Sequence, residues 1–283
     1  MKQLFITFLL AFSFTVYAQP KVLTQATITT KTTVEAPEGD ELVQTVTSAE
    51  HGEVRMMRSS GDGVTKSTTW LKNNLIKPFS NNEMGETTVI RDNEKKITTT
   101  IIEMMGRKSG FYVTDKDQEE MRKSMDSMMK GRGQNMSIGG SIPPSIFDIV
   151  YINENKIISG FTCKKAYVIG TNSKIKSDTT TVWYCPDFKL KNLPSTGGAL
   201  GGFGGFNVTA SKDGLEDLAG FPMQYEKNMS RGRKMTVQVS KITIDKEIAD
   251  KEFEVSKDIE IKPMKDMQGG GIRGEGVQIR IAH

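Results

Sequence analysis

Two cysteines, Cys163 and Cys185, are the residues of this chain best suited to covalent chemistry. They stand 22 positions apart, and the chain has two histidines, His51 and His283. A zinc site needs several Cys or His ligands at short, regular spacings, and this spacing matches none of them. We therefore expect no metal and no cofactor, and we interpret the two cysteines as a structural pair.

The cysteines fall on the two arms of a predicted hairpin. Residues 161–169 and 179–185 have strand character, and the polar residues 171–174 separate them. If the pairing is centred on residue 174, opposite positions sum to 348, and positions 163 and 185 satisfy that sum. Facing Cα atoms of antiparallel strands lie within the range that a disulfide accepts, so we predict a Cys163–Cys185 disulfide. The same register places Lys165 opposite Trp183, as a cation–π pair.

The sequence contains no assembled catalytic constellation. His51 lies in a polar segment with no nucleophile motif nearby. A carboxylate pair such as Asp117 and Glu120 would serve glycoside chemistry only inside a cleft, whereas both residues fit the start of a helix. We therefore expect the protein not to be an enzyme.

A methionine stripe marks a predicted helix over residues 117–130. Asp117, followed three positions later by Glu120, resembles a capping box, and Gly131 supplies the stop. The apolar positions of this helix lie on one face: Met121, Met125, Met128 and Met129. Because thioethers suit varied apolar partners, these residues are candidate ligand contacts in a lid; the alternative is a helix face packed against the sheet.

A glycine-rich segment, residues 197–206, carries Phe203 and Phe206 as further candidate ligand contacts. It lacks the Lys-Ser/Thr ending and the following helix of a phosphate-binding loop. Its two interpretations are a mobile apolar flap over a cavity and a surface loop.

Most of the remaining chain alternates with period two, which is typical of half-buried strands. In residues 22–34, Val22, Ala26, Ile28 and Val34 share one face. Short connections favour antiparallel pairing, and residues 92–95 form a predicted turn. Within 233–244 the apolar positions switch parity, which predicts a bulge. The other predicted strands are residues 65–72, 87–91, 97–104, 110–114, 148–158, 222–227 and 259–263.

The first eighteen residues have the pattern of an export signal. Lys2 precedes an apolar run over residues 4–12, and Val16 and Ala18 are small residues at the positions before a cleavage site. We predict cleavage after Ala18 and a periplasmic or secreted protein. The residue after the predicted cleavage site is Gln19, whereas lipid attachment needs a cysteine there, so the chain is not expected to be a lipoprotein. No later stretch approaches the roughly 20 apolar residues of a spanning helix, so no transmembrane segment is expected in the mature chain.

Length and charge complete the domain assignment. After the signal peptide at 1–18, residues 19–265 are predicted to form a single β-rich domain, with flexible insertions at about 131–142 and 188–217, and residues 266–283 a loose Gly-rich tail. The 38 Lys and Arg against 34 Asp and Glu give a charge of +4, and the basic residues are scattered. We therefore expect no nucleic-acid partner.

Several short segments resemble a domain family of unknown function found in secreted and periplasmic bacterial proteins. They are WLK (70–72), TVIRD (88–92), ISGFTCKK (158–165), VWYCPD (182–187), GFPM (220–223) and FEV (253–255). Such domains are similar to the LolA/LolB lipoprotein carriers. The resemblance implies an α+β, mainly β fold, in which a strongly curved antiparallel sheet forms an open half-barrel with one or two helices over its concave side. It also implies an activity of holding an acyl chain or another apolar group.

These observations lead to two functional hypotheses. The first is an exported, non-enzymatic protein that holds a lipid or another apolar ligand in the half-barrel. The alternative is an envelope or secreted interaction module that contacts another protein and holds no small ligand.

Overall fold

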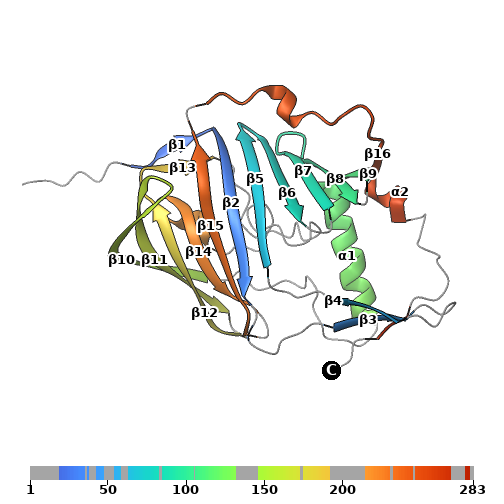
Figure 1. Ribbon diagram of the computed structural model, residues 1–283, viewed down its shortest axis with the longest axis horizontal. Helices are drawn as coiled ribbons and strands as arrows, with labels where there is room; N and C mark the ends of the chain where they lie inside the picture. The colour runs from blue at the N-terminus through green and yellow to red at the C-terminus, as the bar shows by residue number, and fades with distance from the viewer. Residues whose placement is uncertain are drawn as a thin grey trace, which may run out of the picture.

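A single sheet of twelve strands dominates the fold. Figure 1 shows the computed structural model of the chain. All neighbouring strands in it pair antiparallel except β16, which runs parallel to β9. The structure describes residues 19–35, 37, 43–47, 54–58, 63–82, 85–104, 106–131, 146–172, 175–191, 214–229, 232–244, 246–268 and 278–280.

The strands follow one another across the sheet mostly by short hairpin connections, as the sequence predicts. In spatial order they are β10 (Ile146–Ile158), β11 (Phe161–Asn172), β12 (Ile175–Cys185), β14 (Phe221–Asn228), β15 (Lys234–Thr243), β2 (Gln25–Glu35), β5 (Gly63–Lys72), β6 (Leu75–Asn82), β7 (Gly85–Asp92), β8 (Ile97–Met104), β9 (Arg107–Thr114) and β16 (Ile261–Pro263).

Smaller elements accompany this sheet. The helix α1 (Asp115–Gly131) follows β9 directly and stands at the end of the sheet opposite β10 (Figure 1). The other elements are a parallel pair, β1 (Lys21–Leu23) with β13 (Phe188–Leu190); a three-stranded sheet of β17 (Gln278–Arg280), β3 (Val43–Thr47) and β4 (Val54–Arg58); the helix α2 (Met264–Gln268); and the 3-10 turns η1 (Leu215–Asp217) and η3 (Asp250–Phe253).

Alternation along β2 follows the predicted period of two. Ala26, Ile28 and Val34 are buried, while their neighbours are partly or fully exposed. Val22 is an exception, because the strand pattern breaks at Thr24 and the buried residue of β1 is Leu23. Val22 is 60% exposed, so its predicted place on the buried face is wrong.

The predicted bulge in β15 is confirmed. Its pairing with β2 shifts by one residue between Val239 and Lys241. Because of this shift, Val237 and Ile242 both pair with residues on the same face of β2, although one has an odd number and the other an even one. The strand β6 was not predicted, because Pro78 within it lacks the N–H donor of a ladder residue and its apolar residues do not alternate.

Two apolar clusters form the core along β10–β15. One gathers Cys163, Cys185, Phe188 and Phe221 with the start of β2, and the other gathers Val168, Val182, Tyr225 and Val237 with η1. The middle of the sheet differs, because hydroxyl-bearing residues are buried there among the apolar ones. They are Thr30 and Thr32 on β2, Ser67 and Thr69 on β5, and Thr98 and Thr100 on β8. The hydroxyls of Thr30 and Ser67 lie 2.6 Å apart and are hydrogen-bonded.

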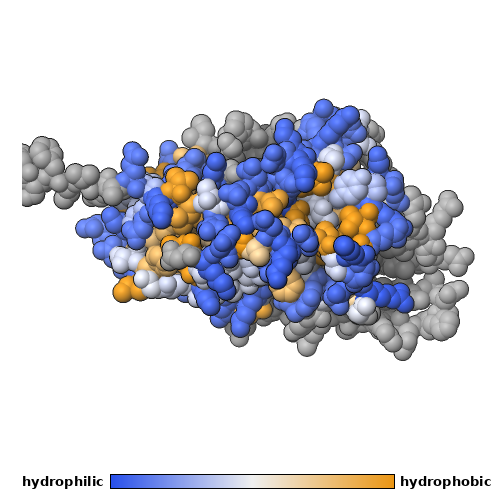
Figure 2. Space-filling model, turned by 90° about the horizontal axis from the view of Figure 1, so that it is seen from above, coloured by the Kyte–Doolittle hydropathy of each residue, from blue (hydrophilic) through white to orange (hydrophobic). Residues whose placement is uncertain are grey.

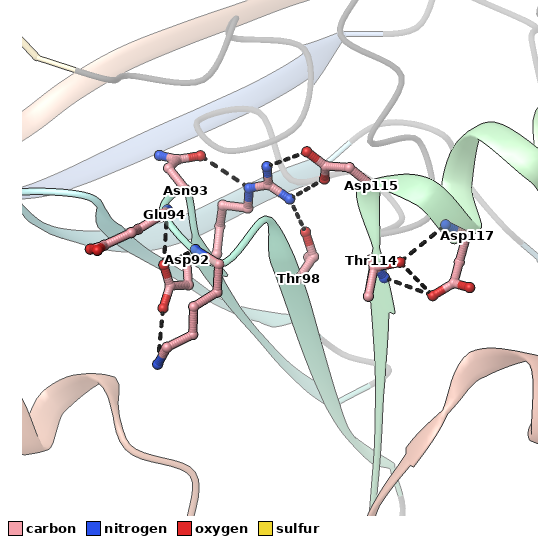
Figure 3. A network of polar contacts seen from close by, with 9 residues as sticks. Asp92, Asn93, Glu94, Thr98, Thr114, Asp115 and Asp117 are labelled. Carbon is pink, nitrogen blue, oxygen red and sulfur yellow. Dashed lines mark hydrogen bonds and ion pairs between the residues drawn. The ribbon is translucent and has the colours of Figure 1, made fainter.

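The start of α1 is fixed by a reciprocal cap, shown in Figure 3. The backbone N–H of Asp117 donates to Thr114 Oγ1 (3.1 Å), and the Thr114 backbone N–H and hydroxyl donate to Asp117 Oδ2 (3.2 and 2.6 Å). Thr114 is therefore the N-cap and Asp117 the third helical residue. The capping box predicted at Asp117 and Glu120 is wrong by three positions, because Thr114 offers the hydroxyl before the strand has ended.

A second contact ties the same helix turn back to the sheet. Arg91 on β7 donates to both carboxylate oxygens of Asp115 (2.5 and 2.9 Å) and to the hydroxyl of Thr98 on β8 (3.2 Å). Figure 3 labels Asp115 and Thr98 and draws these contacts as dashed lines. The hydrogen bonds from Arg91 lower the pKa of the Asp115 carboxyl below its usual value. The first residue of α1 is thus joined to β7, two strands away from the strand that it follows.

Replacing Thr114 with alanine should remove the N-cap and destabilise the protein by about 1 kcal/mol, measured by urea unfolding. Thr114→Ser is the matched control, since it keeps the hydroxyl and should lose much less. Equal losses in the two variants would contradict the capping role.

The Arg91–Asp115 pair should give a stability term that depends on pH. Because the folded-state pKa of Asp115 is lowered from 3.8, the pair stabilises the fold above that pH, and the contribution disappears as the pH falls through the lowered pKa. We expect Arg91→Gln to be less stable than the parent at pH 7 and to approach it near pH 2. The exposed Arg107→Gln is the control and should show no such convergence; a gap for Arg91→Gln that is the same at both pH values would contradict the assignment.

Candidate functional site

The edge strand β10 is the most accessible part of the large sheet. It is the last strand on its side, it spans 13 residues, and β11 is its one partner among the described residues. Three large hydrophobic residues on it are exposed: Val150 (44%), Tyr151 (48%) and Ile157 (75%). Edge strands offer backbone groups to an added strand, and natural proteins often blunt them, so a long edge with exposed apolar side chains indicates an interaction site.

Tyr151 has a structural role despite its exposure. Its hydroxyl accepts a hydrogen bond from the backbone N–H of Ala219 (3.0 Å), and its ring meets that of Tyr184 edge-on, with centroids 5.5 Å apart. Val150 and Ile157 are therefore the two apolar side chains of the edge for which a partner would provide the packing.

Next to this edge lies an aromatic and basic group of side chains that we call the Trp183 cluster: Lys156, Lys165, Tyr167, Trp183 and Gln224. Lys165 pairs with Trp183 across β11 and β12, which confirms the predicted register, and its Nζ lies 5.7 Å from the indole centroid. The same Nζ lies 5.5 Å from the ring of Tyr167. Lys156 approaches the indole from β10, with its Nζ 5.6 Å from the centroid.

Gln224 on β14 fixes the position of Lys156. Its side chain is buried at 7% exposure, beside Trp183 in the ladder, and its Oε1 accepts a hydrogen bond from Lys156 Nζ (2.9 Å). A buried amide oxygen needs a donor, so this contact holds the end of a flexible lysine above the indole.

A bulge in β10 supplies the acidic member of the site. Pairing with β11 shifts between Ile152 and Asn155, and Glu154 within this shift accepts hydrogen bonds from Lys165 Nζ (3.0 and 3.2 Å). The contact with Glu154 raises the pKa of Lys165, so the ammonium stays protonated at neutral pH. Lys165 therefore acts as a fixed cation, and a neutral amine nucleophile is disfavoured.

The two cysteines lie beside this cluster but differ from the prediction in their chemistry. The ladder between β11 and β12 follows the predicted sum of 348 and ends at Lys164 and Tyr184, one pair short of the cysteines. Cys163 pairs instead with Lys156, and Cys185 with Phe221. Both cysteines are buried free thiols, so the predicted Cys163–Cys185 disulfide is not seen in the structure.

Burial controls the reactivity of these thiols. It raises the pKa of Cys163 to about 12 and that of Cys185 to about 11, since the thiolate form would lose its hydration. Neither thiol is therefore an activated nucleophile.

The apolar ligand contacts predicted from the sequence fall largely outside the described residues. Met121 is half-buried on α1, whereas the side chains of Met125, Met128 and Met129 lie outside the description, as do Phe203, Phe206, His51 and His283. The lid and flap therefore stay predictions. Among the described residues, no group of three or more His, Cys, Asp or Glu could hold a metal ion, and no helix has the length and apolar character to span a membrane.

Sequence reasoning found one pair of the cluster and missed the rest. Lys165 with Trp183 follows from hairpin arithmetic, but Gln224 comes from a strand far along the chain, and no local pattern joins it to Lys156. A signal for Lys156 exists in the turn Ser159-Gly160, where both residues have positive φ (50° and 85°), as in a two-residue hairpin. Counting outward from that turn places Lys156 opposite Cys163, as observed.

No family model and no curated protein matches the chain. The domain family named from the sequence therefore remains a resemblance. Distant likenesses to solved structures exist. Two structures of PNGF-II, in the C2 and P21 space groups, have TM-scores of 0.36 and 0.33 at 12% and 13% identity, covering 87% and 86% of this chain and 32% and 33% of theirs.

Two further likenesses are to MucB. The structure of MucB has a TM-score of 0.36 at 8% identity, covering 86% of this chain and 61% of MucB; MucB in complex with MucA(peri) has 0.35 at 7%, covering 82% and 54%. This chain thus spans about a third of PNGF-II and less than two thirds of MucB. At these scores we draw no conclusion on function from them.

The reduced protein should react slowly with iodoacetamide at pH 8. With a pKa of about 11 to 12, the thiolate fraction is on the order of a hundredfold or more below that of an ordinary cysteine, and burial adds a steric barrier. Mass spectrometry should find two alkyl groups added quickly after unfolding in urea and few under native conditions. Equal rates in both states would contradict the burial of the thiols.

Proposed function

We propose that this chain is an exported, non-enzymatic binding protein that engages another protein through the β10 edge and the Trp183 cluster. The observation that carries the proposal is the edge strand itself, which is 13 residues long, with Val150 exposed on the face of the Trp183 cluster and Ile157 exposed on the opposite face. Aromatic residues are enriched at protein interfaces, because they provide large contact areas with few side-chain torsions to order.

Charge and burial support the non-enzymatic part of the proposal. Lys165 is held as a cation by Glu154, and the two cysteines are held as neutral, buried thiols. The reactive side chains closest to the proposed interface are thus kept in their unreactive forms, which suits a binding surface. Export rests on the sequence of residues 1–18, which lie outside the described residues.

The buried hydroxyl residues favour a protein partner over an acyl chain. In the half-barrel hypothesis, a strongly curved sheet would enclose the ligand on its inner face, and the inward side chains would have to be apolar. The middle strands bury Thr30, Thr32, Ser67 and Thr69 among the apolar residues of β2 and β5, and the hydroxyls of Thr30 and Ser67 are hydrogen-bonded to each other. A hydrocarbon ligand provides these hydroxyls with no hydrogen-bond partner, whereas backbone and side chains do.

Seen from above the view of Figure 1, hydrophobic residues form separate patches divided by hydrophilic ones (Figure 2).

Site-specific photo-crosslinking tests the proposal. A photoreactive benzoylphenylalanine at Ile157 or Val150, introduced in the native host, should give a discrete protein adduct on gels. The same probe at Val64 on β5, which is 56% exposed, is the matched control and should give none.

Two outcomes would contradict the proposal. One is the absence of any adduct specific to the β10 positions. The other is native mass spectrometry of the purified protein that shows a stoichiometric lipid, which would support the apolar-ligand hypothesis instead.

A further inference from the structure

We propose that β10 receives an extended, acidic segment of the partner as an added strand, and that Lys156 binds a carboxylate of that segment. This inference rests on the proposed function, which it refines by naming the chemistry of the bound segment. It is carried by three observations: the geometry of the edge, the contacts that hold the Lys156 side chain, and the face on which its neighbours lie.

The edge can accept an added strand over two stretches. Before the bulge, Ile146–Ile152 pairs with β11 without interruption, and after it Asn155–Ile158 resumes the ladder. In an antiparallel sheet alternate residues turn their N–H and C=O groups away from the existing partner. An incoming extended peptide can pair with these groups, as in other cases of strand addition.

The Lys156 ammonium is held by two contacts and forms no ion pair within the described residues. Its contacts are the Oε1 of Gln224 and the indole of Trp183, and none of the ion pairs among the described residues includes it. Lys165, which shares the same indole, is neutralised by Glu154. Two ammonium groups thus lie near one ring and one carboxylate pairs with Lys165, which leaves the Lys156 charge unpaired by the described acidic residues.

Gln224 makes this cation suitable for recognition. An ordinary surface lysine loses much rotamer freedom when it pairs, and its net contribution is small for that reason. Here the amide oxygen and the indole already hold the ammonium, and its remaining donors are available to an incoming group. A carboxylate is the complement, since it accepts hydrogen bonds and carries the opposite charge.

The neighbours of Lys156 determine what else the segment should contain. Val150, Ile152 and Lys156 pair respectively with Tyr167, Lys165 and Cys163, which are alternate residues of β11. The three side chains therefore share one face of the sheet, and the bulge keeps them in phase. An added strand would place an acidic side chain beside Lys156 and an apolar one beside Val150, because cross-strand neighbours lie side by side.

Peptide display on the full exported chain tests this inference. A library of random ten-residue peptides is selected against the parent protein, Lys156→Glu and Lys66→Glu. Lys66 is an exposed lysine on β5 and is the matched control. Peptides selected by the parent and by Lys66→Glu should be enriched in Asp and Glu next to apolar residues. With Lys156→Glu the acidic enrichment should vanish or turn basic.

Affinity measurements complete the test. A selected peptide should bind Lys156→Glu at least about fivefold more weakly than the parent, whereas its Asp→Asn version should lose that discrimination. Binding is followed by the fluorescence of Trp183 in a Trp70→Phe background, which leaves Trp183 as the one indole. N-methylation along the peptide should weaken binding at every second position, because alternate N–H groups face β10.

The failures of the inference and of the proposed function can be told apart. Crosslinks at Ile157 together with peptides of no acidic preference would overturn the inference and leave the protein-binding function standing. Acidic enrichment that persists in Lys156→Glu, or N-methylation effects without a period of two, would also overturn it. A library with no selected peptide and no crosslink at β10 would overturn both.

Discussion

The pairing of β11 with β12 is the constraint on which the candidate site depends. It sets Lys165 opposite Trp183, and each further contact of the cluster is built outward from that pair. On one side β10 adds Lys156, and on the other β14 adds Gln224, so four neighbouring strands contribute to one group of side chains. A shift of one residue in this register would turn Trp183 to the opposite face and separate it from the other residues of the Trp183 cluster. The apolar residues that flank it, Val182 and Tyr184, are buried in the core on that opposite face and make such a shift costly.

Local patterns in the sequence were enough for most strands and for one pair in the site. The alternation of apolar residues predicted β2, and the change in parity of the apolar positions predicted the bulge of β15. The constant sum of opposite hairpin positions predicted the pairing of Lys165 with Trp183. Each of these patterns depends on residues a short distance apart. What could not be predicted depends on distant segments. Gln224 reaches Lys156 across 68 positions, and no period in either strand specifies that contact. The strand β6 was not predicted, because Pro78 interrupts the alternation that marks a strand.

The start of α1 shows how a small geometric difference changes an interpretation. Asp117 is a residue type that often caps helices, so it was predicted as the N-cap. The hydroxyl of Thr114, three positions earlier, is the actual N-cap, and Asp117 accepts the return hydrogen bond. The helix therefore begins directly after the last residue of β9, with no linker. Arg91 then joins its first residue to β7, so the helix direction is set by two contacts of different kinds, one within the chain turn and one across the sheet.

The bulge at Asn153 and Glu154 has a consequence for how copies of the chain behave in a crowded compartment. An uninterrupted apolar edge of 13 residues would template stacking of like chains into fibrils, since each copy would present the same open ladder to the next. Two extra residues divide that ladder, and an acidic side chain stands at the division. Indiscriminate self-assembly is thereby penalised, while a short visiting peptide can still fit on either side of the interruption.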